Sequence, residues 1–188
     1  MRGCEQVAAV CYRVRRGDIE FLLVRTNSGH WTFPKGGAEP GLTHAQAAAL
    51  EAFEEAGVHG RMEEASFTRY VRRKRGAIKN SGEKSAGKEL AVQAHLCEVL
   101  RLDPPRERNR NPTWFSAEKA KRRLREDRTP DFAAELARVV DTAVRRIRRL
   151  RREISPATAE PKKDALQKVQ FIDSARRVTR RAKVAGAG

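Results

Sequence analysis

The pattern of apolar and polar positions divides much of the chain into short extended segments. Residues 7–15 and 20–25 are apolar or β-branched runs, and the turn sequence at 16–18 between them contains a glycine. Two such runs around a glycine-containing turn predict a β-hairpin. Residues 90–100 alternate between apolar and polar side chains, which predicts a longer strand. Shorter extended pieces are predicted over 30–33, 66–73 and 113–115.

Helical signals occur in three further places. Residues 43–46 form a capping box before an alanine-rich helix, and Gly57 marks the C-terminal end of that helix. A second helix is predicted over 117–125, capped by Ser116, and a third begins around Pro130, a residue that the first helical turn tolerates. The third helix carries arginines on most faces and one apolar stripe, which faces a core or a partner. The stripe consists of Phe132, Leu136, Val139, Val140, Ala143, Ile147, Leu150 and Ile154.

Two internal segments lack a regular pattern and are predicted to be loops. Residues 34–41 contain two prolines and three glycines, and residues 72–88 are basic with interspersed Gly and Ser. A linker then precedes a weaker basic helix predicted over 162–183. The length suits one ordinary domain with an extension. We therefore expect one domain over residues 1–154 and a basic, partly flexible tail over 155–188.

Composition and charge narrow the classes of partner. The chain of 188 residues carries 40 Lys and Arg against 24 Asp and Glu, a formal net charge of +16, and most of the excess lies after Asp103. Such a charge favours phosphorylated small molecules, nucleic acid or anionic lipid, although a solvated arginine-rich face has the same composition. No apolar run approaches the ~20 residues of a membrane-spanning helix. Cys4, Cys11 and Cys97 cannot all pair, so we interpret them as reduced thiols and expect a cytoplasmic protein.

Candidate chemistry lies in the 34–41 loop and the helix that follows it. Glu51, Glu54 and Glu55 share one face of that helix, where their like charges repel. Carboxylates suit hard divalent cations, and Mg²⁺ or Mn²⁺ commonly lies between carboxylates and substrate phosphates. The loop adds glycines for close backbone approach and Lys35 as a point charge for a phosphate. Three acids on a helix face are more often only a solvated surface, but together with the loop they indicate metal-assisted hydrolysis of a phosphoanhydride.

The segment from Gly36 to Val58, GGAEPGLTHAQAAALEAFEEAGV, resembles the Nudix box. The pattern of that box is G-x5-E-x7-R-E-U-x-E-E-x-G-U, with U an aliphatic residue. The spacing matches without an insertion, and residues 31–35 resemble the family's approach to the box. Two positions depart from the pattern, because Leu42 stands where it has Glu and Leu50 where it has Arg.

The resemblance implies an α/β fold of the Nudix type, an α/β/α sandwich around a mixed β-sheet, here with a basic helical C-terminal extension. It implies Mg²⁺ or Mn²⁺ as the cofactor. It assigns Glu51 and Glu54 as catalytic carboxylates, and Glu51, Glu54, Glu55 and the carbonyl of Gly37 as metal ligands. A further carboxylate ligand from outside the box is expected, with Glu83, Glu89 and Glu98 as candidates.

The resemblance also implies hydrolysis of a phosphoanhydride in a nucleoside-diphosphate-linked or polyphosphorylated small molecule. Expected phosphate contacts are Lys35, Arg72, Arg73 and Arg75, which favours a dinucleoside polyphosphate or a diphosphoinositol phosphate. Removal of pyrophosphate from RNA 5′ ends is an alternative. Because the pattern's Arg would orient a box glutamate, its replacement by leucine leaves open a degenerate domain that binds nucleotide or RNA without catalysis. The basic C-terminal segment is a candidate RNA contact or dimerisation arm, and no membrane partner is expected.

Overall fold

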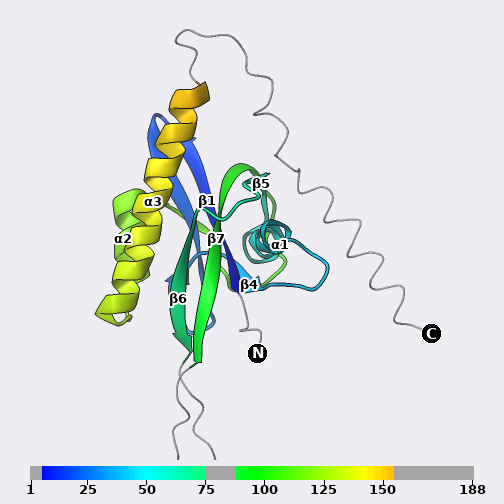
Figure 1. Cartoon of the computed structure of the whole chain (residues 1–188), viewed down its shortest axis with the longest axis vertical. Coiled ribbons are helices and arrows are strands. Elements are labelled where there is room, and N and C mark those ends of the chain that lie inside the picture. Colours follow the sequence, from blue (N-terminus) through cyan, green and yellow to red (C-terminus); the bar gives the residue numbers. More distant parts are fainter. Residues whose placement is uncertain (1–5, 75–87, 155–188) are drawn as a thin grey trace, which may run out of the picture.

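The computed structural model describes residues 6–74 and 88–154 (Figure 1). The predicted hairpin is present as β1 (Gln6–Arg15) and β2 (Asp18–Arg25), which pair antiparallel. At its turn, Arg16 and Gly17 have φ values of 52° and 90°. These are left-handed conformations, which glycine adopts without steric cost, so the turn sequence determines where the chain reverses.

The sheet is mixed because two of its inner strands run parallel. β1 pairs in parallel with β7 (Lys88–Leu102), and every other pairing between described strands is antiparallel. The main path of the sheet is β3–β2–β1–β7–β5, while β4 pairs with β1, β6 with β7 and β8 with β2. The shorter strands are β3 (Trp31–Thr32), β4 (Lys35–Gly37), β5 (Val58–Met62), β6 (Thr68–Lys74) and β8 (Thr113–Ser116).

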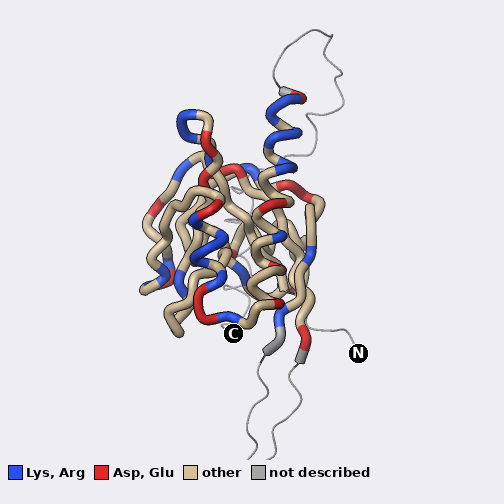
Figure 2. Tube along the Cα trace, turned by 90° about the vertical axis from the view of Figure 1, so that its left-hand side faces the viewer, with Lys and Arg blue, Asp and Glu red and all other residues tan. Residues whose placement is uncertain are grey.

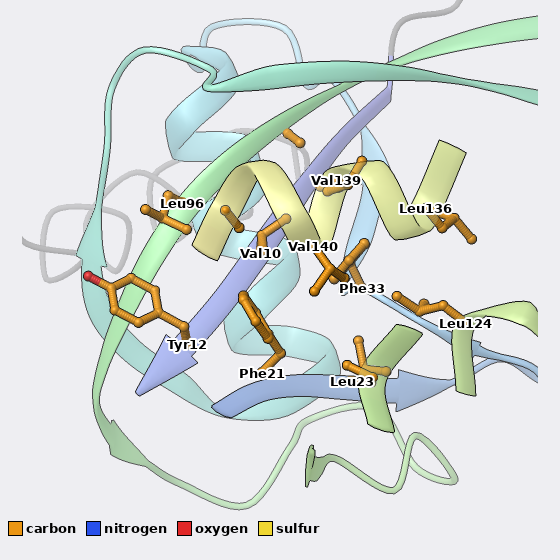
Figure 3. Close-up of a cluster of buried hydrophobic side chains, with 14 of the residues drawn as sticks. Val10, Tyr12, Phe21, Leu23, Phe33, Leu96, Leu124, Leu136, Val139 and Val140 are labelled. Atoms are coloured by element: carbon orange, nitrogen blue, oxygen red, sulfur yellow. The ribbon is translucent and has the colours of Figure 1, made fainter. Parts of the chain in front are cut away.

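Helices cover both faces of the sheet (Figure 1). α1 (His44–Ala56) buries its alanines on one face, in a cluster with alternate residues of β1. α2 (Ala117–Arg125) and α3 (Pro130–Ile154) cover the opposite face. Figure 3 shows the core on that side, where Val140 of α3 and Val10 of β1 belong to one buried cluster. The α/β/α sandwich around a mixed sheet is therefore confirmed.

The ends of α1 follow the local signals in the sequence. The Thr43 hydroxyl accepts a hydrogen bond from the Gln46 N–H at 3.2 Å, and the Thr43 N–H donates to the Gln46 side chain at 2.9 Å. Gly57 ends the helix in the left-handed conformation, with φ at 66°. These caps fix where α1 begins and ends, and with that the side of the helix on which its glutamates lie.

The structure corrects the sequence predictions in four places. Lys35–Gly37 forms β4 inside the segment predicted to be irregular, because its backbone pairs with β1. Val58–Met62 forms β5, which was not predicted and which pairs with β7 across a register shift. Lys74 ends β6 and Lys88 begins β7, although both lay within the loop predicted over 72–88. The Ser116 side chain makes no capping hydrogen bond to α2.

Several predictions lie outside the described residues. These are the basic helix over 162–183 with the linker before it, Arg75 and Glu83. The division between residues 1–154 and 155–188 stays a prediction. In the part of the chain that is described, no helix combines the length and apolar character needed to cross a bilayer.

Candidate active site

The glutamates predicted to bind metal all come from α1, which contacts β4. The carboxylate of Glu51 lies directly against the backbone of Gly36, where a Cβ atom would overlap the glutamate oxygens. Position 36 therefore has to be glycine for Glu51 to adopt this position. The close backbone approach that the loop glycines predicted is present at this residue.

Glu55 is held more tightly than the other two glutamates. Its side chain is only 3% exposed. One carboxylate oxygen accepts a hydrogen bond from the Lys35 backbone N–H at 3.2 Å, and the other lies 2.8 Å from Nη2 of Arg110. A buried carboxylate costs several kcal/mol of desolvation unless it is paired and hydrogen-bonded. These two contacts offset the free-energy cost of burying the Glu55 carboxylate beside β4.

Arg110 is a site residue that the sequence did not reveal. It lies between β7 and β8, is 17% exposed, and also pairs with Glu107 at 2.6 Å. The segment that carries it is tied to α1, because the Glu107 N–H donates to the Glu54 carbonyl at 2.9 Å. Leu50, which stands where the box pattern has its Arg, is buried in α1. A cation from a distant loop thus contacts the glutamate cluster.

Burial and neighbouring charges change the pKa values of Glu51 and Glu55. Burial, followed by the charges of Glu55 and Glu54, raises the pKa of Glu51 from 4.5 to about 7. Burial also raises the pKa of Glu55, and the nearby positive charges of Arg110 and Lys35 oppose that rise. Glu54 is half-buried. Burial and the neighbouring carboxylates therefore both disfavour the ionised form of Glu51 while no cation is bound.

The carboxylates of α1 are hard oxygen ligands, the chemistry that Mg²⁺ and Mn²⁺ prefer. Among residues 6–74 and 88–154, no group of three or more His, Cys, Asp or Glu side chains is placed to hold a metal ion by itself. Mg²⁺ is commonly bound through one or two carboxylates together with substrate phosphates and water, so a complete cage is not required. Glu51 and Glu55 are brought next to the 35–36 backbone, and Gly37 follows directly at the exposed end of β4.

The predicted phosphate contacts separate into described and undescribed residues. Lys35 is half-buried, and burial lowers its pKa to about 8, with Arg72 among the positive charges that lower it further. The negative charge of Glu55 opposes this fall. Arg73 belongs to β6 but its side chain is not described, and Arg75 lies outside the described residues.

The predicted outer carboxylates that the structure describes both lie on β7. Glu98 lies 3.6 Å from Arg61, and Glu89 is exposed on β7. Glu107 and Glu39 are the carboxylates outside α1 whose charges contribute to the raised pKa of Glu51. Neither was predicted, and both lie in loops, where periodicity carries no information about position.

Residues 5–136 of this chain match the sequence profile of the NUDIX domain. The chain belongs to the NUDIX family. The match covers well over half of the chain and includes the whole box, so the resemblance inferred from the spacing of the glycines and glutamates is confirmed. It also includes β7 and Arg110, which lie far outside the box.

Curated relatives match the chain over part of their length. The asymmetrical bis(5′-nucleosyl)-tetraphosphatase of Sus scrofa is 52% identical over 48 residues, which is 24% of this chain and 33% of the relative. The enzyme of the same name from Caenorhabditis elegans is 47% identical over 51 residues, covering 26% of this chain and 37% of the relative. The NUDIX chain therefore spans only about a third of the length of these relatives in each match.

Solved structures share the fold over a longer range. A C. elegans Ap4A hydrolase binary complex superposes with a TM-score of 0.51 and 23% identity, covering 73% of this chain and 98% of the other. A NUDIX hydrolase from Nitrosomonas europaea gives a TM-score of 0.53 and 22% identity, covering 84% and 98%. At these identities the comparison establishes the NUDIX fold and leaves the substrate open.

Proposed function

We propose that this chain is a NUDIX hydrolase that cleaves a phosphoanhydride bond in a dinucleoside polyphosphate, with Mg²⁺ or Mn²⁺ as cofactor. Family membership supports the hydrolase class. Local similarity to enzymes named bis(5′-nucleosyl)-tetraphosphatase supports the substrate class over diphosphoinositol phosphates and RNA 5′ ends. The observation that carries the proposal is the glutamate cluster, with Glu51 against Gly36 and Glu55 bonded to the Lys35 backbone.

Glu51, Glu55 and Glu54 would hold the divalent cation, and the carbonyl of Gly37 is a further candidate ligand. When bound at these carboxylates, the cation would supply Lewis-acid stabilisation for negative charge on a phosphate group. The chain's own part is to keep the carboxylates in place. Arg110 and the Lys35 N–H hold Glu55, while the close packing of Glu51 against Gly36 limits its movement.

Glu54 and Glu51 are the proposed acid–base residues. In the protein without a cation, burial and neighbouring carboxylates raise the pKa of Glu51 to about 7, and a bound divalent cation would lower it and keep the carboxylate ionised. Glu54 is half-buried and one helical turn further along α1, so its carboxylate shares the surface on which the substrate would lie. Lys35 and Arg72 supply positive charge for the phosphates.

The test is a hydrolysis panel with the purified full chain and either Mg²⁺ or Mn²⁺. Diadenosine tetraphosphate, a diphosphoinositol phosphate and 5′-triphosphorylated RNA would be offered separately, with release of each product measured. We expect turnover of the dinucleoside polyphosphate, and loss of at least 100-fold in Glu54→Gln and Glu51→Gln. Glu64→Gln is the matched control, because Glu64 is exposed and lies outside the cluster.

Two other outcomes separate the alternatives. Preferred turnover of the inositol or RNA substrate would keep the hydrolase class but replace the substrate. Wild-type protein that binds nucleotide and cleaves none of the three with either cation would refute the proposal and favour a binding domain without catalysis.

A further inference from the structure

The C-terminal turns of α3 carry a run of arginines that the proposed reaction does not use. Between positions 145 and 153 there are six arginines and one glutamate. Figure 2 shows this end of α3 projecting from the body of the fold, with its basic residues in blue. α3 and the glutamates of α1 lie on opposite faces of the sheet, so this end of α3 is separate from the candidate active site.

Four of the arginines lie on one side of α3. At about 3.6 residues per turn, positions that are three, four and seven residues apart share one side of a helix. The arginines with this spacing are Arg145, Arg148, Arg149 and Arg152. All four side chains are exposed, and we call these four residues the arginine face of α3.

The apolar stripe of α3 is not available to a partner. From Leu136 to Ile147 the stripe is buried in the core cluster, and Leu150 packs against that cluster. Over this length the stripe therefore faces the core. The large apolar side chains that are exposed in the described residues all lie on strands and are Val71, Leu100 and Leu102. A protein interface needs an apolar centre and a helix on a membrane surface needs a free apolar face, so the arginine face suits neither.

The arginine face is not neutralised by carboxylates of the described residues. The neighbouring Arg146 pairs with Glu63 at 3.1 Å. Among residues 6–74 and 88–154, no ion pair involves any of the four arginines, and Glu153 pairs with none of them. Arg145 donates to the Thr142 hydroxyl at 3.1 Å, which leaves its charge uncompensated.

The helix dipole explains only part of this arrangement. Cations are favoured in the last turn of a helix, where Arg151 and Arg152 lie. The effect falls off within that turn, so it does not account for Arg145, Arg148 or Arg149. Like charges three or four residues apart also repel one another. A polyanion with closely spaced charges would remove that repulsion.

Double-stranded nucleic acid has the charge that this face lacks. The four arginines span roughly 10 Å along α3 at about 1.5 Å per residue. A duplex carries one negative charge per about 1.7 Å of its axis, so this length faces about six phosphate charges. The arginine face contains no aromatic residue to stack on a base, and phosphate contacts carry no sequence information. We propose that the arginine face of α3 binds the phosphate backbone of double-stranded nucleic acid without reading its sequence.

Fluorescence anisotropy with a labelled DNA duplex of about 20 base pairs tests this surface without relying on hydrolysis. The full chain would be titrated at several salt concentrations between about 50 and 200 mM, with EDTA present. The logarithm of the binding constant falls by about 0.9 per phosphate contact for each unit in the logarithm of the salt concentration. Four contacts therefore predict that the affinity of wild type falls by at least about 100-fold over this range.

Glutamine at Arg148, Arg149 and Arg152 together removes three of the contacts. We expect this triple variant to reduce the salt slope by about 2–3 and to weaken binding at about 0.15 M salt by about 10- to 100-fold. Lysine at the same three positions keeps the charge and should leave the slope within about 1 of wild type.

The matched control removes the same number of charges away from the arginine face. It carries glutamine at three exposed arginines, which are Arg108, Arg122 and Arg125. The affinity of this control should differ from that of wild type by less than about 3-fold, because its net charge is unchanged relative to the triple variant but the arginine face is intact. Glutamine is a good helix former and all the replaced positions are exposed, so both variants should fold, which thermal unfolding verifies.

Four results would overturn the inference. They are no duplex binding by wild type, equal weakening in the triple variant and the control, a strong preference for one of two duplexes of unrelated sequence, and tighter binding to anionic lipid vesicles through the same three arginines. The last result would assign the surface to a membrane instead. An RNA duplex of the same length should show the same dependence on the three arginines, because it presents the same phosphate groups.

Hydrolysis assays separate this inference from the proposed function. With diadenosine tetraphosphate and Mg²⁺, the triple variant should keep kcat and KM within about 3-fold of wild type, because α3 and α1 cover opposite faces of the sheet. Duplex binding that depends on the arginine face, in a chain that hydrolyses nothing, would refute the proposed function and support this surface. Turnover by a chain that binds no duplex would support the function and refute the surface.

Discussion

Glutamine at position 51 should stabilise the cation-free protein above neutral pH and have little effect in acid. Burial and neighbouring carboxylates raise the pKa of Glu51 from 4.5 to about 7 in the folded chain. Below pH 4.5 the carboxyl is protonated in both the folded and the unfolded chain, so no penalty applies. Between pH 4.5 and about 7 the unfolded chain releases this proton while the folded chain keeps it, so the free energy of unfolding falls as pH rises.

The size of this effect follows from the two pKa values. At about 1.4 kcal/mol per unit, a rise from 4.5 to about 7 corresponds to roughly 3 kcal/mol of destabilisation once the carboxylate is ionised in both states. Glu51 is only half-buried, and solvent screening reduces the expected value to about 1–2 kcal/mol. Glutamine has nearly the same shape and no charge, so Glu51→Gln should recover about that amount at pH 8.

Urea unfolding at pH 4 and pH 8 in EDTA measures the difference directly. We expect the variant to exceed wild type by about 1–2 kcal/mol at pH 8 and by less than about 0.5 kcal/mol at pH 4. Glu64→Gln, at an exposed position, should show no such dependence on pH. Adding Mg²⁺ at pH 8 should stabilise wild type more than the variant, because a ligand stabilises the state that binds it. A variant that is less stable than wild type by the same amount at both pH values would refute this electrostatic account.

Two further substitutions test how the cluster is held. Arg110→Met should cost about 3 kcal/mol in urea unfolding at pH 7.5, because it leaves the Glu55 carboxylate buried without its cation. The exposed Arg108 lies in the same loop, so an equal loss in Arg108→Met would contradict the pairing. Gly36→Ala should displace the Glu51 carboxylate at a cost of no more than about 1 kcal/mol, because the group that the added methyl meets is the movable end of a side chain. In a Glu51→Ala background that cost should largely disappear, and an undiminished cost in this double-mutant cycle would show that the clash lies elsewhere.

The parts of this fold that the sequence predicted are those determined by neighbouring residues. α1 begins at the Thr43 capping box and ends at Gly57, whose φ of 66° few other residues tolerate. The β1–β2 turn follows from Gly17 in the same way. Because these signals set the bounds of α1, the sequence also placed Glu51 and Glu55 on a common side of the helix. Short-range sequence signals were therefore sufficient to predict the bounds of α1 and the common side of its glutamates.

The elements that the sequence missed depend on distant partners. Val58–Met62 contains Gly60 and lacks clear alternation, and it becomes a strand because it pairs with β7. Lys35–Gly37 is rich in glycine and becomes a strand because its backbone pairs antiparallel with β1. Arg110 lies in a loop without periodicity, so its contact with Glu55 could not be predicted from spacing. In each case tertiary contacts override a weak local preference.

Leu50 stands where the box pattern has an arginine, and it argues against catalysis only if no other basic side chain pairs with Glu55. Arg110 is such a side chain, because it lies 2.8 Å from the Glu55 carboxylate, while Leu50 is buried in α1. Without such a partner, burial would favour the neutral form of Glu55, which binds a divalent cation poorly. Burying both Arg110 and Glu55 costs desolvation free energy. A domain that binds its ligand without catalysis does not need a charged Glu55 and gains nothing from that cost. The Arg110–Glu55 pair therefore favours a working hydrolase over a binding domain without catalysis.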